Sequence, residues 1–180
     1  MTVSSQGTYK NLIEMLDNSR KRYAERPLFG TKRDGNYEWT TYEQFAEKVD
    51  DLRGGLASLG ISSGDKVAII SKNTEEWAVS AYATYGLCGQ HIPMYETQLA
   101  KEWEYIVSDC SAKVLLVSNT TVLEQTLDFP ERIDSLEHVV LISGSNPKEV
   151  KTYDDLLKTG RENPVEVQQP ESGSPMGMIY

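Results

Sequence analysis

The side chains best suited to metal or redox chemistry in this sequence are two histidines and two cysteines. They are His91, His138, Cys88 and Cys110, and they form no CxxC pair or Cys/His cluster. Two histidines cannot complete a four-ligand zinc site without carboxylates, and no motif supplies those carboxylates. The sequence therefore predicts no metal site.

Acid–base chemistry has one candidate, His91, which lies in a segment that resembles a β-strand. A histidine there could transfer protons, but a lone histidine is more often a hydrogen-bonded structural residue, so both interpretations stay open. The acidic pairs Asp50-Asp51, Glu75-Glu76 and Asp154-Asp155 are adjacent and so point apart on a helix. GxGxxG, GxxxxGK[ST], GxSxG and HExxH are all absent. We therefore assign no catalytic residue.

A candidate for ligand binding is the loop Tyr95-Glu96-Thr97, which follows a predicted strand over Gln90 to Met94. In open α/β sheets, ligands collect outside the carboxyl ends of the strands, which is where this loop would lie. A second interpretation is that Thr97 only caps the helix that follows.

The N-terminal elements are a helix and a small hairpin. Apolar residues from Tyr9 to Tyr23 recur at three- and four-residue spacings behind Thr8, a plausible N-cap, and predict an amphipathic helix that ends before Pro27. Two short strands, 28–33 and 36–40, then flank Asp34-Gly35, a dipeptide that accepts the positive φ angles of a tight hairpin turn.

Strands and helices alternate along the rest of the chain. Thr41 and Gln44 form a capping-box pattern that starts a helix over residues 41–59, which ends at Gly60. Further helices are expected behind Asn73, around residues 99–107 and over 121–127. The predicted strands are 66–71, 90–94, 113–117 and 138–142. This order predicts the α/β class, with an open, mostly parallel sheet, flanking helices and the small N-terminal hairpin.

Three parts follow from these patterns. Residues 1–145 form an N-terminal α/β subdomain, and residues 146–175 hold a short helix from Thr152 to a stop at Gly160 and a polar connector. Residues 176–180 are apolar and resemble the start of a strand. Because a native chain seldom ends on an apolar strand directly after a linker, we expect a continuation to be missing.

Composition and charge exclude some classes of binding partner and cellular location. Hydrophobic residues make up 39% and charged residues 25% of the 180, as in a soluble globular chain. The net charge is −9, and no basic run exceeds Arg20-Lys21-Arg22, which argues against nucleic-acid binding. Residues 1–10 hold no signal peptide, the aliphatic runs are too short to cross a bilayer, and two cysteines fit a reducing compartment. We therefore expect a cytoplasmic chain without a transmembrane segment.

Several short motifs occur in order along the chain: residues 37–45 (YEWTTYEQF), 56–60 (LASLG), 64–69 (GDKVAI), 73–77 (NTEEW) and 92–95 (IPMY). Together they resemble the motifs of the adenylate-forming, AMP-binding enzymes, and within them those of the long-chain fatty acid–CoA ligases (acyl-CoA synthetases). The resemblance implies an N-terminal fragment of a ligase, part of a larger N-terminal domain. Such an enzyme adenylates a fatty carboxylate with ATP, releases pyrophosphate and passes the acyl group to CoA.

The resemblance also implies where the chemistry lies. In such ligases, a sequence like 178–180 leads directly into the Ser/Thr/Gly-rich phosphate loop that holds ATP. The intact parent would use fatty acid, ATP, CoA and Mg²⁺, and whether it lies on a membrane surface stays open. We expect this chain to lack the catalytic motifs and to bind none of these cofactors tightly. Tyr95, Glu96 and Thr97 would form part of the wall near the CoA and acyl tunnels.

A different class of function also stays open. The chain could be a stand-alone, non-catalytic module that forms a homodimer or binds a partner through its apolar residues 176–180. An unrelated flavodoxin-like or receiver-like fold is disfavoured, because a receiver needs acidic residues after its early strands and Ser71-Lys72-Asn73 supplies none.

Overall fold

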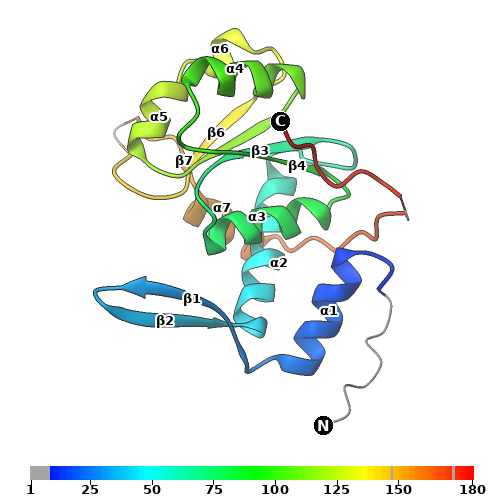
Figure 1. The fold of residues 1–180 in the computed structure, drawn as a ribbon. Helices are drawn as coiled ribbons and strands as arrows, with labels where there is room; N and C mark the ends of the chain where they lie inside the picture. The colour runs from blue at the N-terminus through cyan, green and yellow to red at the C-terminus, as the bar shows by residue number, and fades with distance from the viewer. Residues whose placement is uncertain (1–8, 147, 172) are drawn as a thin grey trace.

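A computed structural model describes residues 9–146, 148–171 and 173–180, and a parallel five-stranded sheet lies at its centre (Figure 1). The strands are arranged in the order β4-β3-β5-β6-β7. Their bounds are β3 Lys66–Ile70, β4 Gln90–Met94, β5 Val114–Val117, β6 His138–Leu141 and β7 Lys151–Thr152. The predicted α/β class with an open parallel sheet is confirmed. The short strand β7 was not predicted.

Helices cover both faces of the sheet. One face carries α2 (Tyr42–Ser58), α3 (Glu75–Tyr85) and α7 (Tyr153–Glu162), and the other carries α4 (Ala100–Asp109), α5 (Thr120–Thr126) and α6 (Phe129–Arg132). Along β3, Val67 and Ile69 pack into the first layer, whereas Ala68 and Ile70 pack into the second. This two-sided burial is the reason that the strand sequence shows no polar alternation. The four-residue helix α6 was not predicted.

The N-terminal helix and hairpin lie beside this body. Helix α1 spans Leu12–Tyr23, and strands β1 (Pro27–Arg33) and β2 (Asn36–Thr41) pair antiparallel in a separate sheet that projects from the body in Figure 1. The turn residues Asp34 and Gly35 adopt φ angles of +48° and +85°, as the hairpin prediction requires.

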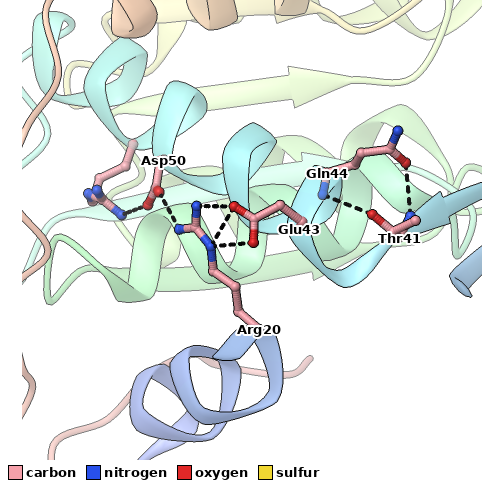
Figure 2. A network of polar contacts seen from close by, with 6 residues as sticks. Arg20, Thr41, Glu43, Gln44 and Asp50 are labelled. Atoms are coloured by element: carbon pink, nitrogen blue, oxygen red, sulfur yellow. Dashed lines mark hydrogen bonds and ion pairs between the residues drawn. The ribbon is translucent and has the colours of Figure 1, made fainter. Parts of the chain in front are cut away.

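Helix α1 is held on α2 by a polar network (Figure 2). The Arg20 guanidinium donates to both oxygens of Glu43 and to Asp50, and these hydrogen bonds lower the pKa of the Glu43 carboxyl. The side chains of Arg20 and Glu43 are each about one-third exposed, so this pair contributes at most about 1 kcal/mol. Beside it, Thr41 and Gln44 form the predicted capping box, which fixes the start of α2.

Three predicted N-caps were wrong. Helix α1 is capped by Asn11, whose Oδ1 accepts from the Glu14 N–H at 2.9 Å, while Thr8 lies outside the described residues. Helix α3 is capped by Thr74 rather than Asn73, because the Thr74 hydroxyl accepts from the Trp77 N–H. Thr97 does not cap α4. Its N-cap is Leu99, whose N–H donates to the Glu102 carboxylate at 2.9 Å.

The predicted helix stop at Gly160 was also wrong, because α7 continues to Glu162 and Gly160 serves a close helix crossing. A Cβ at Gly160 would overlap the carbonyl oxygen of Asp51, and a Cβ at Gly54 or Gly55 of α2 would lie within 2.7 Å of the α7 backbone. Three glycines therefore let two helix backbones touch.

The imidazole of His91 is part of the core. His91 is only 2% exposed, and its Nε2 lies 3.0 Å from the Ser80 hydroxyl oxygen. Ser80 donates its one hydrogen to the Trp77 carbonyl at 2.8 Å, so Nε2 donates to Ser80. The rings of Trp77 and Tyr85 contact the imidazole edge-on. Burial in these surroundings lowers the pKa of His91 to about 4.

Replacement of Gly160 by alanine tests the helix crossing. We expect Gly160→Ala to lower the free energy of unfolding by about 3 kcal/mol, because the added methyl group forces α2 and α7 apart. Urea denaturation measures the change. Lys158→Ala, an exposed position on the same helix, is the control and should stay within about 0.5 kcal/mol of the original. Equal stability of the two variants would contradict the crossing geometry.

The burial of His91 predicts a pH dependence. Between pH 6.5 and pH 4, the unfolded chain binds a proton at His91 that the folded chain excludes. Stability is therefore fully present above this window and falls with pH through it, by about 3 kcal/mol at most from this group. We expect His91→Gln to reduce the slope of unfolding free energy against pH, measured by urea denaturation. Ile179→Ala, which removes no titratable group, should keep the original slope, and an unchanged slope in His91→Gln would refute the assignment.

Candidate functional site

The topology of the sheet creates one crevice at the carboxyl ends of its strands. From β3 the chain passes through α3 to β4 on one side, whereas from β5 it passes through α5 and α6 to β6 on the other side. The loops after β3 and β5 therefore diverge to opposite faces. Such a switch point is where ligands bind in open α/β sheets.

A groove of about 570 Å³ lies at this point, and we call it the switch-point groove. It is formed by the loops that follow β3, β4, β5 and β6, by the first turn of α3 and by strand β1 of the hairpin. Its lining residues are Phe29, Gly30, Thr31, Arg33, Ser71, Lys72, Asn73, Thr74, Glu75, Glu76, Glu96, Ser118, Asn119, Ile142 and Ser143.

Several polar groups of the groove are already paired within the chain. The Ser71 hydroxyl donates to the Lys72 carbonyl at 2.8 Å, and the Ser143 hydroxyl donates to the Ser118 carbonyl at 2.7 Å. The Thr74 hydroxyl accepts from the Trp77 N–H in the first turn of α3, and the Asn119 side-chain Oδ1 accepts from the Val122 N–H in the first turn of α5. These turns are closed by their own side chains, unlike an open loop of free N–H groups that cradles a phosphate.

The charges of the groove are mixed, with carboxylates in excess. The side chain of Glu75 is only 10% exposed, and its carboxylate lies 2.7 Å from Lys48 Nζ and 2.9 Å from the Thr40 hydroxyl. The two basic lining residues each lie beside a carboxylate: Lys72 is 3.9 Å from Glu96, and Arg33 is 3.2 Å from Glu38. The groove therefore presents little positive potential to an anion.

The predicted loop Tyr95-Glu96-Thr97 is placed at this edge of the sheet, but only Glu96 lines the groove. Tyr95 is 67% exposed, and its carbonyl accepts from the Trp103 indole N–H at 2.9 Å. Thr97 is exposed as well. The ligand contacts proposed for these three residues stay a prediction.

Sequence reasoning missed most of the groove. Ser71 ends one predicted strand and Ser118 follows another directly, so the rule that selected Tyr95 also points to them. The contribution of Phe29 to Arg33 had no local signal, because it depends on how the hairpin packs against the first turn of α3.

The described parts of the chain contain no cluster of metal ligands, and both cysteine thiols have a raised pKa. Within residues 9–146, 148–171 and 173–180, no group of three or more His, Cys, Asp or Glu side chains could hold a metal ion. Cys88 and Cys110 are free thiols, and burial raises the pKa of both. No helix in these ranges is long and apolar enough to cross a membrane.

Comparison with known proteins places this geometry in a family. The sequence profile of the AMP-binding enzyme family matches residues 16–180. Fatty acyl-CoA synthetase B of Dictyostelium discoideum is 26% identical over 167 residues, which cover 84% of this chain and 25% of that protein. The long-chain-fatty-acid–CoA ligase ACSBG1 of Homo sapiens is 28% identical over 172 residues, which cover 90% of this chain and 23% of that protein.

Solved structures share the fold. The anthranilate CoA ligase AuaEII in complex with anthranoyl-AMP superposes with a TM-score of 0.82 at 22% identity, covering 98% of this chain and 33% of that one. A long-chain-fatty-acid–CoA ligase (FadD1) from Archaeoglobus fulgidus gives a TM-score of 0.79 at 18% identity, covering 100% and 36%.

The matches cover most of this chain but only a small part of each relative. The chain spans about a quarter of the length of the curated relatives it matches, whereas they cover most of the chain. Because the family profile extends over residues 16–180, the chain belongs to the AMP-binding enzyme family.

Proposed function

We propose that this chain is the N-terminal part of an ATP-dependent fatty acid–CoA ligase and that it serves as a scaffold without catalysing the reaction itself. The observation that carries the proposal is the match over residues 16–180 to a family whose similar members bear the names fatty acyl-CoA synthetase and long-chain-fatty-acid–CoA ligase. Those relatives are about four times as long as this chain.

In this proposal each of the three parts of the chain has its own role. Residues 1–145 supply the rigid sheet and its helices, residues 146–175 connect, and residues 176–180 lead toward the phosphate loop of the ligase. The complete enzyme would form a fatty acyl adenylate from ATP with release of pyrophosphate, and would then transfer the acyl group to the CoA thiol. The location of the protein in the cytoplasm stays a prediction.

The residues of the switch-point groove do not fit ATP or its Mg²⁺. A triphosphate needs free N–H donors and cations, but the groove has capped turns and carboxylate-paired Lys72 and Arg33. Glu75 is held by Lys48 and Thr40, so its oxygens are already engaged. This mismatch supports a scaffold role for the chain, and we derive no step of the reaction from it.

A second candidate is a self-associating, non-catalytic module. Two exposed apolar features favour it: Ile179 is 91% exposed, and the rings of Tyr37 and Trp39 stack on the outer surface of the hairpin. Exposed apolar groups of this kind are common at sites that bury against another chain.

The scaffold proposal predicts no adenylation by the purified chain. ATP–pyrophosphate exchange with a long-chain fatty acid should equal the blank without protein, and calorimetry should show ATP binding weaker than about 1 mM. An intact fatty acid–CoA ligase serves as the positive control under the same conditions. Exchange that copurifies with the chain, or stoichiometric tight uptake of ATP, would overturn the proposal.

Light scattering after size-exclusion chromatography separates the two candidates. We expect a monomer of 20.2 kDa for the scaffold. A stable dimer that is lost in Ile179→Asp or Trp39→Asp would favour the self-associating module instead, because a charge in an apolar interface is costly to bury.

A further inference from the structure

We propose that Gly177 and the main chain of His91 form an anchor that positions residues 176–180, and with them the phosphate loop of the ligase. Only the last step, from the segment to the phosphate loop, rests on the proposed function. The anchor itself is argued from contacts within this chain.

The anchor lies on the free side of the edge strand β4. On its inner side β4 pairs with β3 from Gln90 to Met94. On its outer side the His91 N–H donates to the Met176 carbonyl at 2.9 Å, and His91 and Gly177 form a parallel bridge. This bridge fixes the position of the segment along the strand.

The bridge requires a residue without a side chain at position 177. A Cβ on Gly177 would lie 2.5 Å from the carbonyl oxygen of His91, which is closer than such contacts tolerate. That oxygen belongs to backbone and cannot move aside as the end of a flexible side chain could. The close approach therefore depends on glycine.

The other half of the anchor is held rigidly from within. The buried His91 ring hydrogen-bonds to Ser80 and lies edge-on to Trp77 and Tyr85, all three of which belong to α3. The strand around this residue is thus paired with β3 on its inner side, and the side chain of His91 is fastened to α3. The His91 N–H meets the segment from a fixed position.

Beyond the bridge, the segment is held at two more points. Met178 packs against the core beneath α4, and the Tyr180 hydroxyl donates to the Asp109 carboxylate at the end of α4 at 2.6 Å. Between them, Ile179 is 91% exposed. In Figure 1 the red C-terminal segment passes β4 and ends near α4, as these contacts require.

The connector before the anchor is also tied to the body. Arg53 Nε donates to the Val165 carbonyl at 2.8 Å, and the Gln168 N–H donates to the Gly86 carbonyl at 2.8 Å. Farther on, Asn11 donates to the side chain of Gln169. The connector is therefore held along the body from Val165 to Gln169, before the chain reaches the anchor.

Hydrogen exchange on the 180-residue chain tests the anchor without any nucleotide. In Gly177→Ala we expect the His91 amide to exchange about tenfold faster or more, because its acceptor moves away. The amide of Ile69, in the centre of the sheet, should keep its protection. Ile179→Ala, in the same segment but without a buried side chain, is the matched control and should leave both amides unchanged. Unaltered exchange at His91 in Gly177→Ala would overturn the anchor.

The positioning role is tested in the ligase that carries this chain as its N-terminal part. There we expect Gly177→Ala to raise KM for ATP about tenfold with little change in KM for the fatty acid, since only the phosphate loop is displaced. Ile179→Ala should retain both values. If kcat falls while both KM values stay unchanged, or if neither changes, the positioning role is wrong, although the anchor and the proposed function can each still stand on their own tests.

Discussion

The rest of the structure depends on the complete burial of β3 and β5 on both faces. Residues 67–70 and 114–117 have no measurable exposure, and each such aliphatic side chain contributes about 1.5–3 kcal/mol relative to an exposed one. Helices must therefore lie on both sides, and loops can leave the layers only at the ends of the strands. In the order β4-β3-β5-β6, the connection after β3 leads to one side of the sheet and the connection after β5 leads to the other. The two loops therefore separate and leave the carboxyl ends of β3 and β5 uncovered.

The two helical layers are closed by different means. Beneath one face, α7 lies directly on the backbone of α2 through Gly54, Gly55 and Gly160, so little side-chain volume separates them. On the other face, the buried rings of Trp103 from α4 and Phe129 from α6 belong to the core layer against the sheet. The backbone contact also sets the path of the connector, which leaves α7 and runs past Gly86 toward the free edge of β4.

Some features governed by neighbouring residues were predictable, although three N-caps were not, and features governed by distant residues were missed. The capping box of Thr41 and Gln44 and the Asp34-Gly35 turn depend on a few adjacent atoms, and the structure has them. Asn73 and Thr74 are both good caps, so composition could not decide between them. Gly160 was interpreted as a helix end because glycine often ends helices. Its actual role, a backbone contact with α2, depends on residues far away in the sequence. The same limit hid the hairpin side of the groove, whereas its strand-end residues follow from the topology.

Glu75 connects three elements of the molecule, namely the hairpin, α2 and α3. Its carboxylate is held by Thr40 from the hairpin and by Lys48 from α2, while its backbone belongs to the first turn of α3 that lines the groove. The hairpin wall of the crevice is therefore held against the sheet edge by this acidic side chain, together with the ring contact of Phe29 with Phe45 of α2.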